Sequence, residues 1–270
     1  MTKYLDSILI TGAGSGIGEA TTHYLSERGF YIYATDLDEE KLDIFASNDH
    51  VHAIKMDITK KEDIRNAFSI VNDNKEGLYG LINSAGVIRL GPVIEASEEE
   101  LELQFSVNVF GIYHVTKEFY PLIKESKGRI INVSSTAGRF VSPFYGFYSM
   151  SKMAVEAFSD ALRGELKPLG IKVSIIQPGL INTSFWNKTY IPSPQYKDSI
   201  FKEQLDKFVK FSIHDSMPKA FPPEKIVEAI YHALTSKRPK VRYFITHRKI
   251  SQIIAERLPT SWIDYIVSRI

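Results

Sequence analysis

Tyr148 and Lys152 stand one helical turn apart in the run SSTAGRFVSPFYGFYSMSK, which also contains Ser135. A tyrosine hydroxyl is a poor acid–base group at neutral pH because its unperturbed pKa is about 10. A lysine ammonium on the same helix face favours the phenolate and brings that pKa closer to the working pH. Ser135 ends the strand-like run RIINVSS and can hydrogen-bond an oxygen presented to the tyrosine. These residues predict machinery that moves a proton to or from an alcohol oxygen.

The same tyrosine–lysine spacing occurs twice more in the chain, at Tyr113/Lys117 and at Tyr120/Lys124. Both pairs lie on an apolar-periodic segment, which favours a role in packing or at the surface. Only Tyr148 has a strand-end serine upstream, so we assign the chemistry to that pair alone.

The composition of the 270 residues is that of an ordinary globular protein, with 44% hydrophobic and 24% charged residues. A net charge of +1 gives no indication of nucleic-acid binding. Cysteine is absent, which excludes disulfides, thiolate catalysis and cysteine-ligated metal. The seven histidines show no metal-type grouping, so no metal site is expected.

The N-terminal run MTKYLDSILITG lacks the hydrophobic region of a signal peptide, and no window approaches 18 uninterrupted apolar residues. We therefore expect a cytoplasmic protein, with contact to a membrane surface as a further option.

Short apolar runs alternate with helical patterns along the chain. Repeated β–α units predict a doubly wound parallel α/β sheet of about seven strands, with helices on both faces and one domain over residues 1–270. The expected strands are 7–12, 30–36, 51–57, 78–86, 129–135, 172–179 and 241–247.

Two segments interrupt this rhythm. Residues of about 185–223 are rich in aromatics, proline and lysine and are expected to form an insertion that covers the substrate. The tail at about 249–270 has the spacing of two short amphipathic helices divided at Pro259. Its apolar groups could pack on their own domain, border the substrate entrance, join a partner subunit or rest on a membrane surface, to which Trp262 would be suited.

A glycine-rich turn, TGAGSGIG, directly follows the first strand and opens the first helix. Glycines permit a tight turn and close approach of the backbone to a pyrophosphate, whose charge the helix N-terminus favours. The spacing departs from G-x-G-x-x-G, because Ile17 holds the sixth position and Gly18 follows it. In this strand–turn–helix context, the motif predicts dinucleotide binding and a Rossmann-type fold.

Asp36 closes the second strand, where a carboxylate can bind the ribose hydroxyls of NAD and would repel a 2′-phosphate. Leu37, not a basic residue, follows it, so NAD is expected in preference to NADP. A solvated turn aspartate is the alternative. Asp57 ends the third strand, before Ile58, and could meet the adenine edge or cap the next helix.

Together these residues resemble the short-chain dehydrogenases/reductases over nearly the whole chain, with Ser84 where an asparagine is commoner. The resemblance implies a catalytic core of Ser135, Tyr148 and Lys152, with Asn108 as a fourth member that holds a water at a helix kink. The matching pieces are TGAGSGIG at 11–18, Asp36, Asp57, NSAG at 83–86, Asn108, Ser135, Tyr148, Lys152 and QPGLINT at 177–183.

The resemblance also implies which residues bind the cofactor. NSAG would stabilise the sheet and line the adenosine side, and QPGLINT would lie beside the nicotinamide, with Thr183 near its carboxamide. The full expected set is Gly12, Gly14, Ser15, Gly16, Ile17, Gly18, Asp36, Leu37, Asp57, Ile58, Asn83, Ala85, Gly86, Tyr148, Lys152, Pro178, Gly179, Ile181 and Thr183.

Within that family, the segment from Gly138 to Gly179 is similar to the branch of retinol and 17β-hydroxysteroid dehydrogenases, which act on apolar alcohols and ketones. The sequence thus predicts an NAD(H)-dependent oxidoreductase for an apolar secondary alcohol and its ketone. The alternatives are an NAD-binding sensor or scaffold without turnover, and a sugar-nucleotide epimerase or dehydratase, which usually has a larger substrate domain. The expected substrate-lining residues are Phe140, Val141, Phe144, Phe185 and Trp186.

Members of this family commonly pair through the helices that carry the asparagine and the tyrosine–lysine pair. A homodimer or homotetramer is therefore expected, with helices at about 99–124 and 148–168. The second helix has an apolar stripe that could form this interface or could face the sheet, namely Val155, Phe158, Leu162 and Leu166.

Overall fold

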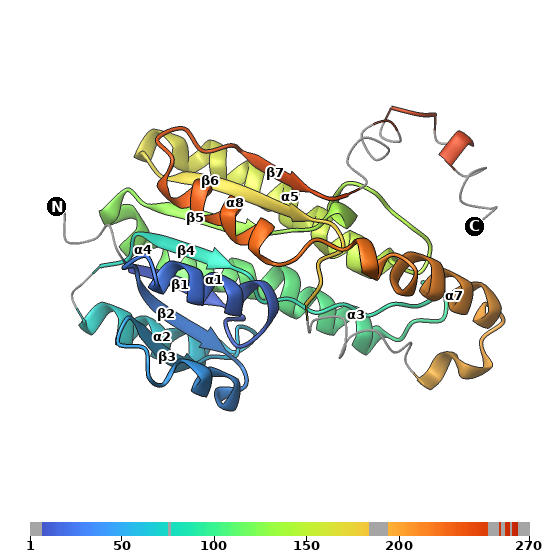
Figure 1. The fold of residues 1–270 in the computed structure, drawn as a ribbon, viewed down its shortest axis with the longest axis horizontal. Coiled ribbons are helices and arrows are strands. Elements are labelled where there is room, and N and C mark those ends of the chain that lie inside the picture. Colours follow the sequence, from blue (N-terminus) through green and yellow to red (C-terminus); the bar gives the residue numbers. More distant parts are fainter. Residues whose placement is uncertain are drawn as a thin grey trace.

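The structure is a computed structural model that describes residues 7–74, 77–183 and 194–247, together with 254, 257–259 and 261–263. The described residues form a seven-stranded sheet whose neighbouring strands all run parallel (Figure 1). The order is β3-β2-β1-β4-β5-β6-β7, which confirms the expected fold class. The strands are β1 (Ser7–Thr11), β2 (Tyr31–Asp36), β3 (Val51–Lys55), β4 (Gly80–Asn83), β5 (Arg129–Val133), β6 (Lys172–Pro178) and β7 (Arg242–Ile245).

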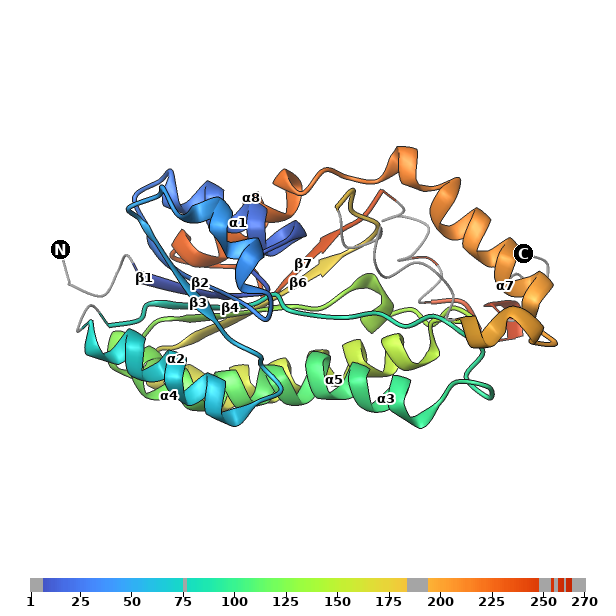
Figure 2. The same ribbon diagram turned by 90° about the horizontal axis from the view of Figure 1, so that it is seen from below.

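Helices cover both faces of this sheet (Figure 2). On one face lie α1 (Gly16–Ser26) and α8 (Glu224–Thr235), and on the other lie α2 (Lys61–Asp73), α4 (Ile112–Ser126) and α5 (Gly146–Leu166). The remaining helical segments are η1 (Glu39–Phe45), α3 (Glu98–Phe105), η2 (Ser106–Gly111), η3 (Thr136–Gly138), η4 (Lys167–Leu169), η5 (Pro194–Asp198), α7 (Lys202–Val209), η6 (Lys210–His214) and η7 (Met217–Lys219).

Strand β1 shows how the sequence pattern builds both cores. Ile8 and Ile10 belong to the core under α1 and α8, whereas Leu9 belongs to the core under α2 and α4. Because successive side chains of a strand point to opposite faces, an uninterrupted apolar run is what a strand buried on both sides requires. The order of strands reverses between β1 and β4, and ligands of doubly wound sheets bind at the carboxyl ends of the strands at such a point.

The expected long helix around Asn108 is three pieces. Ser97 caps α3 by accepting a hydrogen bond from the backbone N–H of Glu100, at 3.3 Å. The π-helical segment η2 then carries the buried Asn108, and α4 continues from Ile112. A π-helical turn inserts a residue into the helix and so changes which side chains face inward.

The expected apolar stripe of α5 faces the sheet for the most part. Leu166 belongs to the core under α2 and α4, and Leu162 packs against that core. Val155 is also buried, whereas the Phe158 ring lies 6.4 Å from that of Tyr113 on α4. The stripe therefore stabilises this layer and is not the exposed interface that was one expectation for it. The apolar residues exposed on the α3–α5 side are Leu103, Phe110, Tyr113, Met150 and Met153.

The segment from η5 to η7 lies beyond the carboxyl ends of the strands, with α7 at the far end of the molecule (Figure 2). It corresponds to the second half of the insertion expected at 185–223. Residues 184–193, including Phe185 and Trp186, lie outside the described residues.

Only seven residues of the expected amphipathic tail at 249–270 are described, and Ile254 and Trp262 among them are exposed. The two-helix prediction therefore stays a prediction. In the described part of the chain, no helix is both long and apolar enough to span a membrane.

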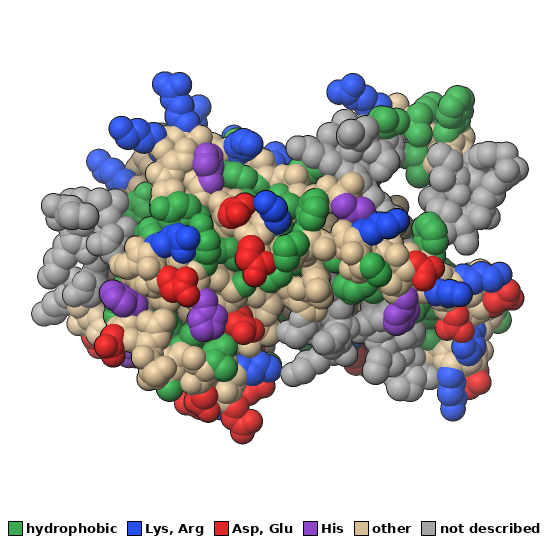
Figure 3. Space-filling view, viewed as in Figure 1, with side chains coloured by type: hydrophobic (Ala, Val, Ile, Leu, Met, Phe, Trp, Pro, Cys, Tyr) green, Lys and Arg blue, Asp and Glu red, His purple; other side chains and the backbone are tan. Residues whose placement is uncertain are grey.

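Charge is mixed on the face that carries α1 and α8. Figure 3 shows Lys and Arg side chains at its upper edge and Asp and Glu at its lower edge, with both signs interspersed between them. This distribution agrees with the net charge of +1.

Candidate active site and cofactor cavity

A cavity of about 770 Å³ lies at the carboxyl ends of the strands. The glycine turn, the ends of β2, β4 and β6, and the tyrosine–lysine pair all line it, although they come from distant parts of the chain. A volume of this size is ordinary for a site that binds a cofactor or small molecule.

The glycines of the turn are held by close approach of other backbone. A side chain on Gly18 would overlap the carbonyl oxygen of Gly12, and one on Gly12 would come within 2.8 Å of Ala85 Cα. Gly12 and Gly16 also have left-handed φ angles, +69° and +57°, which glycine adopts without strain. A Cβ on Gly16 would lie 3.4 Å from Thr183 Cβ, so the turn meets the β6 end of the cavity.

The N-terminus of α1 opens into the same cavity. Ser15 is its N-cap, with extended backbone and no side-chain capping bond, and both Ser15 and Ile17 line the cavity. Backbone N–H groups at a helix N-terminus, beside glycines that leave room for close approach, form a cradle that suits a pyrophosphate. The residues present therefore fit a dinucleotide.

Asp36 lies beside this turn. Its Oδ2 accepts a hydrogen bond from the Gly14 N–H at 3.0 Å, and its Oδ1 accepts one from the Asp38 N–H at 3.1 Å. The carboxylate lines the cavity, as does the exposed Leu37. Asp36 is thus more than a solvated turn residue, because it braces the turn as well as facing the cavity.

Lys41 is a cavity residue that sequence reasoning missed. The 3-10 helix η1 folds back so that Lys41 Cβ would lie 2.7 Å from a Cβ on Gly14. Its ammonium pairs with Asp38 at 2.7 Å, and the residue lines the cavity near Asp36. The sequence shows no base directly after Asp36, and only the fold of η1 brings this one there.

Asp57 and Ile58 also line the cavity. Asp57 Oδ1 accepts hydrogen bonds from the Thr59 N–H at 2.9 Å and the Thr59 hydroxyl at 2.7 Å. This arrangement shapes the turn before α2. The N-cap residue of α2 is Lys60, without a side-chain capping bond, so Asp57 does not cap that helix.

Tyr148 and Lys152 lie buried on the first turns of α5. Lys152 Nζ donates to the Val133 carbonyl at 3.0 Å and stands 5.7 Å from the centroid of the Tyr148 ring. Ser135 hydrogen-bonds Tyr148, accepts from the Ala137 N–H at 3.1 Å and lies 3.5 Å from the Pro178 carbonyl oxygen. The three side chains expected to carry the chemistry are therefore brought together.

Burial controls the proton affinities of this pair. It raises the pKa of Tyr148 to about 12, against a smaller lowering by the hydrogen bond from Ser135. Burial also lowers the pKa of Lys152 to about 8, and the charge of Glu156 acts in the opposite direction. The expected lowering of the tyrosine pKa by lysine is not found in the free protein, because desolvation disfavours both charged forms.

Asn108 fastens the loop after β4 to the catalytic helix. Its Oδ1 accepts from the Val87 N–H at 2.8 Å, and its Nδ2 donates to the Val87 carbonyl at 2.8 Å and to Ser151 Oγ at 3.0 Å. A Cβ on Gly86 would lie 3.3 Å from Asn108 Oδ1 and 3.6 Å from Lys152 Nζ. Asn108 is thus adjacent to Lys152, and its water-holding role remains an expectation from the resemblance.

Some expected cofactor residues lie behind the cavity wall. Asn83 is buried and donates to Asn132 Oδ1 at 2.8 Å and to Thr116 Oγ1 at 3.1 Å, tying β4 to β5 and α4. Gly18, packed against Gly12, supports the turn from the same inner layer. The other expected cofactor residues line the cavity, including Ala85, Gly86, Pro178, Gly179, Ile181 and Thr183.

Only some of the expected substrate residues line the cavity. Phe140 lines the cavity, whereas Val141 is exposed and does not. Phe144 adopts a left-handed φ of +65° and turns its ring onto Phe208 of α7, with ring centroids 5.5 Å apart, away from the cavity lining. Sequence reasoning missed several lining residues, which come from several separate segments of the chain: Arg89, Ser142, Tyr145, Phe208, Ser216 and His247.

The described residues hold no cluster of three or more His, Asp or Glu side chains that could bind a metal ion.

Comparison with known proteins agrees with this geometry. Residues 6–192 match the model of the short chain dehydrogenase family. The chain is 34% identical over 277 residues to 17-beta-hydroxysteroid dehydrogenase type 6 of Rattus norvegicus, covering 97% of this chain and 87% of the relative. It is 32% identical over 263 residues to mitochondrial D-beta-hydroxybutyrate dehydrogenase of the same species, covering 88% and 76%.

Among solved structures, a short chain dehydrogenase from Burkholderia cenocepacia in complex with NADP superposes with a TM-score of 0.75. It is 26% identical, with 99% of each chain covered. The chain belongs to the short-chain dehydrogenase family. It is an NAD(P)-dependent oxidoreductase that acts on hydroxyl or keto groups.

Proposed function

We propose that the protein interconverts an apolar secondary alcohol and its ketone with NAD(H), using Tyr148 as the general acid and base. One observation carries this proposal: Ser135, Tyr148 and Lys152 meet in the same cavity as the glycine turn. The bound nicotinamide supplies or accepts the hydride. The glycine turn and Asp36 would hold its dinucleotide.

The side chains divide the remaining work. Ser135 binds the substrate oxygen and stabilises charge on it, and Tyr148 donates its proton to that oxygen in reduction or takes it in oxidation. Since burial raises the pKa of Tyr148 to about 12, the free protein holds this side chain in its protonated form. Lys152, charged below its pKa of about 8, stabilises the phenolate that forms.

The function is tested with a panel of alcohols and ketones and both nicotinamide cofactors, followed by absorbance of the reduced cofactor. We expect turnover of bulky apolar secondary alcohols. Binding of NADH without turnover of any panel member would instead support the sensor or scaffold alternative.

A small hydroxy acid is the second candidate substrate. Arg89 lines the cavity, and a guanidinium there could pair with a carboxylate. One relative is a hydroxybutyrate dehydrogenase and another a hydroxysteroid dehydrogenase. The panel therefore includes 3-hydroxybutyrate beside a hydroxysteroid, and a higher kcat/KM for the hydroxy acid would overturn the apolar assignment.

For the cofactor, the position of Asp36 supports NAD over NADP, while Lys41 opposes this by placing a cation nearby. We expect a lower dissociation constant for NADH than for NADPH, measured by cofactor fluorescence. Lys41→Met should weaken the binding of NADPH further and leave the dissociation constant of NADH within about twofold of its wild-type value. NADPH binding as tight as NADH binding would contradict the preference.

For assembly, the exposed apolar residues of α3, η2 and α5 support a homodimer or homotetramer, because such a face is costly to leave in water. The test is the mass by light scattering at micromolar concentration. A monomer mass would contradict the proposal.

We further propose a cytoplasmic location, with the tail bordering the substrate entrance and touching membrane there. Exposed Trp262 and Ile254 support an apolar contact of the tail. Truncation from Pro259 onward should raise the KM of bulky substrates by a larger factor than it raises the dissociation constant of NADH. A folded truncation with unchanged kinetics and unchanged sedimentation with phosphatidylcholine vesicles would refute this.

A further inference from the structure

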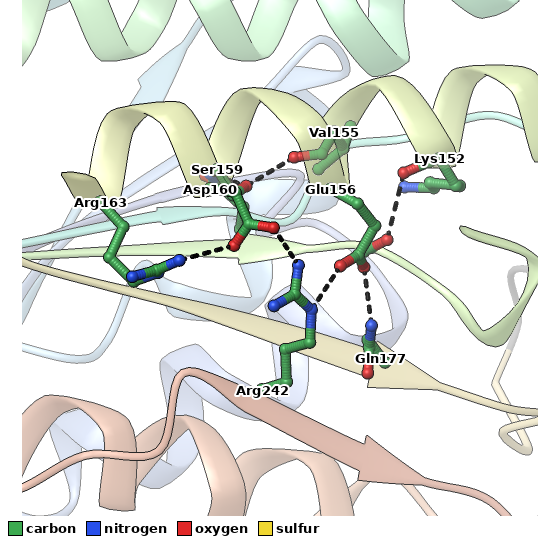
Figure 4. Close-up of polar contacts among 10 residues, drawn as sticks. Lys152, Val155, Glu156, Ser159, Asp160, Arg163, Gln177 and Arg242 are labelled. Atoms are coloured by element: carbon green, nitrogen blue, oxygen red, sulfur yellow. Dashed lines mark hydrogen bonds and ion pairs between the residues drawn. The ribbon is translucent and has the colours of Figure 1, made fainter. Parts of the chain in front are cut away.

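A carboxylate lies on the catalytic helix one turn beyond Lys152. Figure 4 shows Lys152, Glu156 and Asp160 on successive turns of α5, with Arg242 of β7 reaching toward the two acids. Glu156 lies among buried residues, and its side chain is 11% exposed, whereas that of Asp160 is 42% exposed. The two acids therefore differ in solvation as well as in distance from Lys152 along the helix.

Both oxygens of Glu156 are fixed by neighbouring strands. Oε1 accepts from Gln177 Nε2 of β6 at 3.0 Å, and Oε2 accepts from Arg242 Nε of β7 at 2.9 Å (Figure 4). A Cβ on Gly138 would lie 3.2 Å from Glu156 Cγ and 3.0 Å from the Lys152 carbonyl oxygen, so η3 packs closely over this turn. These contacts hold the carboxylate in place one helical turn from Lys152.

Arg242 connects the two acids. Its Nη2 pairs with Asp160 Oδ2 at 2.6 Å, and Asp160 also pairs with Arg163 at 3.1 Å. A buried carboxylate is costly unless cations and hydrogen bonds surround it. Glu156 has one hydrogen-bonded cation on one side and a second, Lys152, one helical turn away on the other.

We propose that Glu156 is a positioning residue that keeps the buried Lys152 in its ammonium form, and that Arg242 and Gln177 hold Glu156 in place for that purpose. The proposal rests on the proposed function, in which the ammonium stabilises the phenolate of Tyr148. Its electrostatic part applies equally to the free protein.

Few other groups around Lys152 could stabilise its ammonium form. In the described structure, Tyr148 and Glu156 are the titratable neighbours of Lys152 on α5. Strand β5 presents the Val133 carbonyl, and η2 presents Asn108, neither of which titrates. Glu156 is thus the acidic group whose charge opposes the effect of burial, which lowers the pKa of Lys152 to about 8.

The test is an NMR titration of ¹³C-lysine-labelled free protein, in which Lys152→Arg identifies the Lys152 resonance. Glu156→Gln, of nearly the same shape, should lower the titration midpoint of Lys152 by about one pH unit. Asp160→Asn is the matched control, because it breaks another carboxylate contact of Arg242 and should leave the midpoint within about 0.2 unit.

Two results would overturn the proposal: an unchanged midpoint in Glu156→Gln, or an equal shift in Asp160→Asn. A purely structural clamp would lower the melting temperature of both variants without moving either midpoint. Should Glu156→Gln fail to fold, Glu156→Asp retracts the charge by one methylene and should lower the midpoint by a smaller amount. An unchanged midpoint there would likewise overturn it.

Activity adds a separate readout. The alkaline limb of kcat for ketone reduction should move to lower pH in Glu156→Gln and stay in place in Asp160→Asn. If the NMR midpoint shifts as expected but no alcohol or ketone is turned over, the proposed function fails and the assignment of Glu156 to Lys152 stands.

Discussion

Two of the three tyrosine–lysine pairs in the sequence have nearly the same local geometry and different surroundings. Lys117 Nζ lies 5.7 Å from the ring centroid of Tyr113, and Lys152 Nζ lies 5.7 Å from that of Tyr148. Tyr113 is 43% exposed on α4, whereas Tyr148 is 8% exposed and hydrogen-bonded by Ser135. The comparison teaches that helical spacing creates the pair and that burial at the carboxyl ends of the strands makes it a site.

Burial does this by removing water from around the charges. In the exposed pair, solvent screens the charge of the lysine and can hydrogen-bond the phenol. In the buried pair, one proton is held tightly on Tyr148 and the pKa of Lys152 falls, so a nearby charge has a large effect on both.

The largest difference between the two pairs should appear in turnover. Tyr148→Phe removes the proton-transfer group, and we expect kcat to fall by about 10²–10⁴ while NADH affinity changes little. Tyr113→Phe, at the same spacing from its lysine, should leave kcat within about twofold. The measurement is steady-state kinetics with a fluorescence titration of NADH. Near-normal turnover of Tyr148→Phe would show that Tyr148 is not the proton-transfer group.

A single methyl group should disrupt the glycine turn that lines the same cavity as the buried pair. Gly18→Ala would overlap the Gly12 carbonyl oxygen, so we expect NADH affinity to fall by about tenfold or more and stability to fall by about 1–3 kcal/mol. Gly164→Ala, inside α5 with open space around it, should instead add up to about 1 kcal/mol. Denaturant unfolding and NADH titration check both, and normal NADH binding by Gly18→Ala would show that the turn tolerates a side chain.

The segment from η5 to η7 tests whether residues far from the buried pair in sequence also shape the site. Phe208 of α7 lines the cavity and meets the ring of Tyr145, with centroids 5.5 Å apart. Phe208→Ala should raise the KM of a bulky substrate about tenfold, roughly 1.4 kcal/mol, with NADH affinity unchanged. Phe211→Ala, half-exposed and outside the cavity lining, is the matched control. Equal effects of the two would show that α7 acts through general stability.

The last expected effect is on the dependence of stability on pH. With a native pKa of about 8 and an ordinary value of 10.5, Lys152 binds its proton more weakly in the folded than in the unfolded chain. Its contribution to the free energy of unfolding therefore rises with pH between these values, by about 1 kcal/mol per pH unit. Lys152→Met should lack this rise and Lys117→Met should retain it in urea unfolding at pH 8 to 10. A parallel pH dependence in wild type and Lys152→Met would contradict the buried assignment.

The sequence by itself determined the succession of strands and helices along the chain and the chemistry of the catalytic group. Apolar runs identify strands buried on both faces, and the glycines of the turn occupy positions where the backbone admits no side chain. The serine, tyrosine and lysine are recognisable because two of them share one helix and the third ends a strand. Such features depend on neighbours along the chain, and the local pattern carries them.

Only the tertiary structure decided what surrounds that group. It turned Asn108 inward through a π-helical segment, folded Lys41 back beside Asp36, and set Phe144 against Phe208 outside the cavity. It also buried Val155 and placed Glu156 between Lys152 and Arg242. The contacts that fix these side chains join residues far apart in sequence, namely Lys41 with Gly14, Phe144 with Phe208 and Glu156 with Arg242. Packing selects such contacts by shape and by the cost of burying charge, which no local spacing encodes.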